Sequence, residues 1–180
     1  MTLAIDLVPH LDAGDRTKWQ GDQNQRPLTE LGLAQALALA DALAIEPVDA
    51  LYSGPALRCR QTLEPLAERS GLRIDVLPEL GAEAWRAPEG WKGQPEEPYV
   101  GAFAAGSAMA AVERMRREHA AGRVVACSHG QVIPALISFL AAAHGLADVP
   151  EIRRGDWYRL RFDGARLAVE LYDAPAGFPR

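Results

Sequence analysis

The sequence contains only two cysteines, Cys59 and Cys127, among its 180 residues. Both lie next to apolar residues, which indicates reduced core thiols in a cytoplasmic protein rather than a disulfide framework. No uninterrupted apolar run reaches about 18 residues, so we expect no membrane-spanning helix. No basic segment precedes the apolar residues near the N-terminus, so a signal peptide is not expected either.

Positive charge is not in excess, since 19 Lys and Arg residues face 24 Asp and Glu residues, giving a net charge of −5. Without a basic field, the chain is not expected to bind nucleic acid or an anionic membrane. The four histidines show no close metal-ligand spacing, so no metal site is expected. The length and the 48% hydrophobic content suit one globular domain, predicted to span residues 1–180.

Short apolar runs that suit buried strands alternate with stretches of helical periodicity along the chain. Alternating residues on both sides of Asp163-Gly164 predict a C-terminal β-hairpin. The other predicted strands are 3–8, 49–53, 73–77 and 123–126. Strands separated by helices predict an α/β three-layer sandwich with a mostly parallel central sheet, helices on both faces and the antiparallel hairpin at the sheet edge.

Two regions of the sequence give specific helix boundaries. A helix is expected from Thr29, as its N-cap, to about Ala44, with Leu33, Leu37, Ala40 and Ala44 on its helical period. Residues 78–106 are rich in Pro, Gly, Trp and Glu, so little regular structure is expected before a helix over 107–121.

Two predicted strands end at a histidine, the first at His10 and the last parallel strand at His129. The carboxyl ends of parallel strands meet at one sheet edge, where the sites of open α/β proteins lie. Arg58, one turn into the helix after the second strand, should reach the same edge. Two imidazoles and a guanidinium suit a phosphate group, because arginine offers paired donors and an unprotonated histidine can accept a phosphoryl group.

Four segments in one order resemble the histidine phosphatase superfamily, which has the phosphoglycerate-mutase-like fold. They are Leu7-Val8-Pro9-His10, Arg26-Pro27-Leu28-Thr29-Glu30-Leu31-Gly32, Leu51-Tyr52-Ser53 through Arg58 to Gln61-Thr62, and Ser128-His129-Gly130. Each segment alone is a weak signal, but the four in the family order are specific. The short chain is similar to a small bacterial branch that includes phosphohistidine phosphatases and domains fused to Nudix hydrolases.

The resemblance implies a role for each matching residue. His10 matches the nucleophile that becomes phosphohistidine, and His129 matches the second histidine, which binds and stabilises the phosphoryl group. Arg58 matches a phosphate clamp, and Arg26 matches a further basic residue near the pocket.

The resemblance also implies an acid that protonates the leaving group, because several branches place a Glu or Asp after the third strand. Glu83 is the candidate in this chain, with Glu79 as the second choice. Neither a metal nor another cofactor is implied.

One departure from the family concerns Pro9, which stands where the family has an arginine directly before the nucleophile. A charge-assisted hydrogen bond is worth roughly 1.5–3 kcal/mol, and losing a donor aimed at the transition state can cost roughly a hundredfold in rate. Leu11, at a position that is usually small, should narrow the pocket. Arg16, Lys18 and Arg60 are the candidates to fill the missing place.

Two functions follow from this pattern. The first is a metal-independent phosphatase that acts through phosphohistidine on a small phosphorylated substrate or a phosphohistidine protein. The alternative is a catalytically degenerate member that binds a phosphorylated ligand or partner without efficient turnover, and Pro9 and Leu11 are the reason for keeping it. A homodimer is left open.

Overall fold

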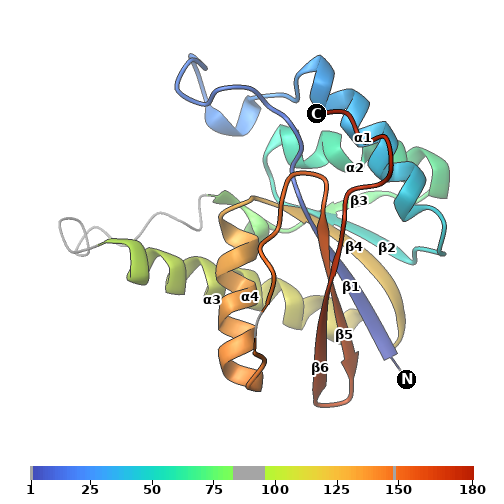
Figure 1. The fold of residues 1–180 in the computed structure, drawn as a ribbon, viewed down its shortest axis with the longest axis vertical. Helices are drawn as coiled ribbons and strands as arrows, with labels where there is room; N and C mark the ends of the chain where they lie inside the picture. The colour runs from blue at the N-terminus through green and yellow to red at the C-terminus, as the bar shows by residue number, and fades with distance from the viewer. Residues whose placement is uncertain (1, 83–95, 148) are drawn as a thin grey trace.

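The computed structural model describes residues 2–82, 96–147 and 149–180, and their strands form a six-stranded sheet in the order β3-β2-β4-β1-β5-β6 (Figure 1). The strands are β1 (Thr2–Pro9), β2 (Ala50–Ser53), β3 (Ile74–Val76), β4 (Gly122–Ser128), β5 (Trp157–Asp163) and β6 (Arg166–Tyr172). The first four pair in parallel, whereas β5 runs antiparallel to both β1 and β6. The β5–β6 hairpin therefore forms one sheet edge, as predicted.

Helices cover both faces of this sheet. They are α1 (Glu30–Leu43), α2 (Leu57–Ser70), α3 (Glu96–Glu118) and α4 (Val132–His144), with short 3₁₀ turns η1 (Gln23–Gln25) and η2 (Pro78–Leu80). α1 and α2 share a core with one face of the sheet, and α3 and α4 share a core with the other face. The predicted α/β three-layer fold is thus confirmed.

The buried face of α1 agrees with the predicted stripe at Ala40 but differs from it at the two leucines. Leu33 and Leu37 are 45% and 53% exposed, while Ala36, Leu39 and Leu43 face the sheet. The helix carries apolar residues on more than one side, so periodicity alone could not select the buried one. Its ends agree with the prediction, because Thr29 is the N-cap and Ala44 the C-cap.

The start of α3 is a correction to the sequence analysis. The helix begins at Glu96, inside the region 78–106 that we expected to lack regular structure, and it ends at Glu118. The alanine-rich stretch 102–111 favours a helix strongly enough to extend it toward the N-terminus. The nearby glycine, proline and tryptophan residues masked this signal.

A buried ion cluster lies on the α1 side of the sheet. Asp6 of β1 is fully buried and accepts hydrogen bonds from Arg123 Nε at 2.8 Å and Arg159 Nε at 2.6 Å. Arg159 also reaches both carboxylate oxygens of Glu46 at 3.0 Å. Two buried arginines from β4 and β5 therefore depend on one carboxylate of the strand between them.

The C-terminal segment lies against α1 after leaving the hairpin (Figure 1). Gln35 of α1 donates through Nε2 to the Pro179 carbonyl at 2.9 Å and accepts through Oε1 from the Asp12 N–H at 3.0 Å. Phe178 packs directly over Gly155, where a Cβ would come within 2.6 Å of its ring. The last residues thus contact α1 and the turn at Gly155, which lie far apart in the sequence.

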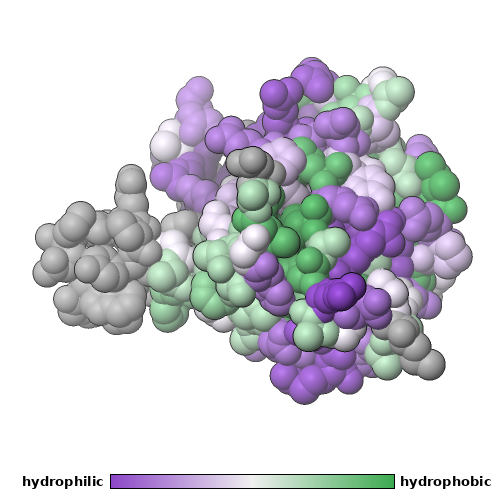
Figure 2. Space-filling model, turned by 60° about the horizontal axis from the view of Figure 1, so that its bottom comes forward, coloured by the Kyte–Doolittle hydropathy of each residue, from purple (hydrophilic) through white to green (hydrophobic). Residues whose placement is uncertain are grey.

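On the face shown in Figure 2, hydrophobic residues gather near the centre and hydrophilic residues surround them. The structure of a single chain does not show whether a second copy covers this hydrophobic area, so the homodimer stays a prediction. Within the described part of the chain, no helix has the length and hydrophobicity needed to cross a membrane.

Candidate active site

The two histidines meet because β1 and β4 are parallel neighbours that end together. Pro9 lies opposite Ser128 in the register, and the His10 N–H donates to the Ser128 carbonyl at 2.8 Å. The imidazole centroids of His10 and His129 are 5.2 Å apart, and the rings are inclined at 75°. The sequence prediction that these residues share one sheet edge is confirmed.

Backbone contacts and burial set the protonation of His10. Its Nδ1 lies 2.8 Å from the Leu11 carbonyl, a contact that requires a proton on Nδ1 and leaves the lone pair on Nε2. Burial lowers the pKa of the His10 imidazole to about 4, and the nearby His129 and Arg58 act in the same direction. An unprotonated Nε2 at neutral pH is the form that can attack phosphorus.

Arg58 joins the pair of histidines from the first turn of α2. Its Nη2 donates to His129 Nδ1 at 3.2 Å, and its Nη1 donates to the Gln23 carbonyl. The Arg58 Nε is buried and has no hydrogen-bond partner within the described residues. Burial lowers the pKa of Arg58, but an arginine stays charged at neutral pH. A buried cation with an unpaired donor favours an anionic ligand.

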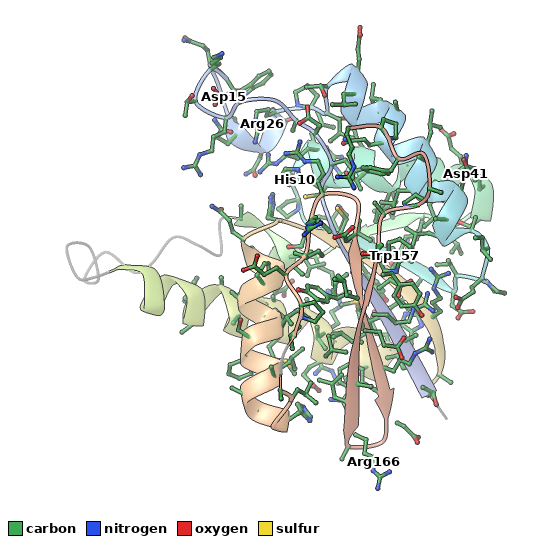
Figure 3. The ribbon with its side chains drawn as sticks, in the orientation of Figure 1. His10, Asp15, Arg26, Asp41, Trp157 and Arg166 are labelled. Carbon is green, nitrogen blue, oxygen red and sulfur yellow. The ribbon has the colours of Figure 1, made fainter. Side chains whose placement is uncertain are left out.

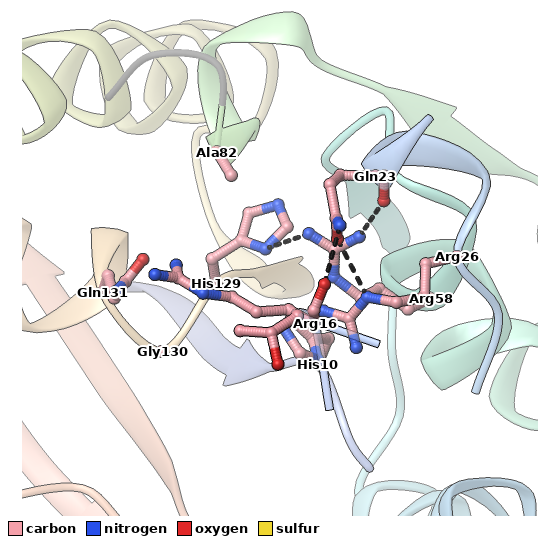
Figure 4. Close-up of a pocket in the computed structure, with 10 residues that line it drawn as sticks. His10, Arg16, Gln23, Arg26, Arg58, Ala82, His129, Gly130 and Gln131 are labelled. Atoms are coloured by element: carbon pink, nitrogen blue, oxygen red, sulfur yellow. Dashed lines mark hydrogen bonds between the residues drawn. The ribbon is translucent and has the colours of Figure 1, made fainter. Parts of the chain in front are cut away.

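These residues line a cavity of about 610 Å³ at the carboxyl edge of the sheet (Figure 4). The cavity is wide enough for more than a phosphate ion, and the N-terminus of α4 lies beside it. Its lining residues are His10, Arg16, Thr17, Gln23, Arg26, Arg58, Ala82, His129, Gly130 and Gln131.

The Thr29-to-Gly32 segment holds the chain that follows His10. Thr29 donates from its N–H to the Asp12 carbonyl at 2.9 Å and from its hydroxyl to the Asp12 carboxylate at 2.7 Å. At Gly32 a Cβ would lie 2.0 Å from the Asp12 carbonyl oxygen, so only glycine fits. The Pro-Leu-Thr-x-x-Gly pattern therefore has a local physical cause, because it anchors the loop after His10 to α1.

The Gln61-Thr62 pair holds the same loop from α2. Thr62 Oγ1 accepts from the Leu11 N–H at 3.2 Å, and Gln61 Oε1 accepts from the Leu28 N–H at 2.8 Å. These two contacts satisfy backbone donors on both sides of the loop. Gln61 and Thr62 do not line the cavity, but they hold the loop that follows His10.

Arg26 lines the cavity, but most of its N–H donors form hydrogen bonds with residues of its own loop. Its Nη1 donates to the carbonyls of Ala13 and Gly14, and its Nε donates to Gln23 Oε1 at 3.1 Å. Arg26 thus closes the loop over residues 13–26 (Figure 3). Of the three residues expected to fill the place left by Pro9, only Arg16 lines this cavity, whereas Lys18 and Arg60 do not.

The two acidic candidates lie elsewhere. Glu83 falls outside the described residues. Glu79 lies in η2 and does not line the cavity, and its carbonyl accepts from the Ser107 hydroxyl of α3 at 3.4 Å. The leaving-group acid therefore stays a prediction.

Sequence reasoning missed two basic residues beside His10. Arg153 and Arg154 line a smaller cavity together with Pro9, His10 and Gly130. They belong to the irregular segment before β5, which matches none of the motifs. The signal available in the sequence was the pair of arginines directly before a glycine turn.

Comparisons with known proteins agree with this fold. A family model described as the histidine phosphatase superfamily (branch 1) matches residues 12–104, beginning just after His10. An 8-oxo-(d)GTP phosphatase of Mycolicibacterium smegmatis is 33% identical over 141 residues, 77% of this chain, but the chain spans only 37% of that relative. An uncharacterized protein of Mycobacterium tuberculosis is 31% identical over 175 residues, 83% of this chain and 84% of the relative.

Among solved structures, the mycobacterial glucosyl-3-phosphoglycerate phosphatase is similar in fold. Its TM-score is 0.72 at 19% identity, over 97% of this chain and 100% of that chain. At this identity the likeness shows the fold alone.

Proposed function

Because this chain belongs to the histidine phosphatase superfamily, we propose that it is a metal-independent phosphatase acting through a phosphohistidine at His10. The observation that carries the proposal is the cavity itself: the unprotonated Nε2 of His10 lies beside His129 and a buried Arg58 that has a donor to spare. Arg58 and His129 would hold the phosphoryl oxygens, and His10 would attack.

The reaction has two displacements at phosphorus. His10 Nε2 forms a bond to phosphorus as the bond to the leaving atom breaks, and this atom, the oxygen of a phosphomonoester or the nitrogen of a phosphohistidine, takes up a proton. Water then attacks the phosphorus of the phosphohistidine and releases a proton to the solvent. The N–P bond breaks, its electron pair returns to Nε2, and phosphate leaves. Glu83 is our proposal for the proton donor in the first step, on the resemblance alone.

The substrate is a phosphomonoester or a phosphohistidine. The relative from M. smegmatis is an 8-oxo-(d)GTP phosphatase, so nucleotides belong in the first substrate panel with phosphohistidine and small phosphates. Because the chain spans only 37% of that relative, the relative's activity on 8-oxo-(d)GTP is carried over to this chain only as a proposal. A cytoplasmic location, indicated by the free buried thiols, also stays a prediction.

The test is hydrolysis of an aryl phosphate by the purified protein in EDTA, with the His10→Ala variant as the blank. Turnover that disappears in the blank supports the phosphatase. No turnover above the blank would favour the degenerate alternative, which the replacement of the family's arginine by Pro9 keeps open.

We expect the His10 imidazole to titrate far below an ordinary histidine. The pKa of about 4 means that His10 is unprotonated from about pH 5 upward, so the nucleophile is available at neutral pH and is lost only in stronger acid. A proton NMR titration of the ring signals measures this midpoint, and the His10→Ala variant assigns the signal. A midpoint near 6.5 would contradict the buried, uncharged nucleophile.

We expect Pro9→Arg to raise turnover of an aryl phosphate, by up to about a hundredfold, because it restores a cation directly before the nucleophile. Pro9→Gln is the matched control, since it also removes the proline ring but adds no charge. Steady-state rates of the two folded variants decide the question. An equal effect of arginine and glutamine would show that charge at this position is not what limits the rate.

A further inference from the structure

A second cavity, of about 220 Å³, adjoins the active site on the side of Pro9. It shares His10 and Gly130 with the larger cavity, so a group held at His10 borders both spaces. Its remaining wall comes from Ile152, Arg153 and Arg154, and none of these residues lines the larger cavity.

The turn that carries the two arginines is firmly held. The buried Asp156 accepts the Arg153 N–H at 2.9 Å through one carboxylate oxygen and the Ala174 N–H at 2.8 Å through the other. Gly155 has a φ of +94° and lies under Phe178, where a side chain would not fit. Because the turn is fixed on both sides, its backbone loses little entropy when the arginines bind an anion.

The charge balance of this cavity is positive. The guanidinium of Arg154 pairs with the Asp12 carboxylate, but the arginine side chain is 53% exposed, and exposed ion pairs are weak. The Asp12 carboxylate also accepts a hydrogen bond from the Thr29 hydroxyl. This hydrogen bond is the main cause of the lowered pKa of the Asp12 carboxyl group. Arg153 is exposed at the edge of the cavity. The described lining of this cavity therefore includes two arginines and no carboxylate, and the Asp12 carboxylate that pairs with Arg154 is partly engaged elsewhere.

We propose that Arg153 and Arg154 form a second anion subsite beside His10, which takes a second anionic group of the substrate, a phosphate or a carboxylate. This inference rests on the proposed function and gives it a substrate class: molecules in which an anionic group neighbours the phosphoryl group that faces Nε2. Guanidinium groups bind phosphate and carboxylate oxygens through paired donors, which makes the subsite selective for planar or tetrahedral anions.

The experiment compares three non-hydrolysable probes by calorimetry in EDTA: methylphosphonate, methylenediphosphonate and phosphonoacetate. We expect at least one probe with two anionic groups to bind about tenfold to a hundredfold more tightly than methylphosphonate, as one or two charge-assisted hydrogen bonds would give. The better of the two identifies the second group as phosphate or carboxylate. Equal affinity for all three probes would overturn the subsite.

The Arg153→Gln/Arg154→Gln double variant should lose this preference while keeping its affinity for methylphosphonate. Arg166→Gln is the matched control, because Arg166 is an exposed arginine in the hairpin, far from His10 (Figure 3). Thermal unfolding checks that each variant is folded, and the single Arg153→Gln variant, which keeps the pair between Arg154 and Asp12, repeats the test. A preference that survives the double substitution would overturn the proposal.

Binding and turnover separate this inference from the proposed function. A preference for two anionic groups that depends on the arginines supports the subsite, even if no aryl phosphate is hydrolysed. Hydrolysis without such a preference would overturn the subsite and leave the phosphatase intact.

Discussion

His10→Ala should reduce turnover of an aryl phosphate by at least about a thousandfold, because the only nucleophile in the proposed mechanism is lost. The variant should fold, since within residues 2–82, 96–147 and 149–180 the His10 side chain makes its hydrogen bond only to the carbonyl of the next residue. Steady-state hydrolysis in EDTA measures the loss. His144→Ala is the matched control, because His144 is an exposed histidine at the end of α4 and should leave the rate unchanged.

A loss of less than about tenfold in His10→Ala would contradict the nucleophile assignment. A second readout is the amount of label left on the protein when its reaction with a labelled substrate is stopped rapidly without acid. Acid is avoided because a phosphohistidine is stable in base and labile in acid. Label should be trapped on the protein without substitutions and on the His144→Ala variant, and it should be absent from the His10→Ala variant. Equal labelling of all three would place the phosphoryl group elsewhere.

Asp6→Asn should lower the free energy of unfolding by roughly 3–5 kcal/mol, because it leaves two buried guanidinium groups without their shared carboxylate. Asp6 is fully buried, and both Arg123 and Arg159 contact it at 2.6 Å. Urea unfolding measures the change. The partly exposed Glu46 contacts Arg159 only from the outer side of the cluster, so it should not replace Asp6.

Asp41→Asn is the control for this stability prediction. Asp41 pairs with Arg69 at 2.9 Å, but its side chain is 73% exposed, so its loss should cost about 0–1 kcal/mol. A cost for Asp6→Asn as small as that of Asp41→Asn would show that the buried cluster is not a major source of stability.

The meeting of His10, Arg58 and His129 could be predicted because it depends on topology. Parallel strands bring their carboxyl ends to one edge, and each of the three residues follows such an end. The exposed position of Leu33 could not be predicted, because α1 is apolar on several sides and only the sheet decides which side is buried.

The partners of individual side chains could not be predicted from the sequence either. Arg26 lies where a basic residue was expected, but its donors are directed to carbonyls of its own loop, which depends on the exact path of the backbone. Arg154 approaches His10 from a segment more than a hundred residues away, and only the antiparallel pairing of β5 with β1 brings it there.

The contact between Gln35 and Pro179 has a practical consequence for handling the protein. The last residues touch α1 and, through Gln35, the loop after His10, while Phe178 covers the turn that carries Arg153. A change that displaces Phe178 and Pro179, such as a nearby purification label, would therefore remove support from α1 and from the turn at Gly155 at once. The protein would then lose activity as if a residue of the cavity had been substituted, although none of these residues had been changed.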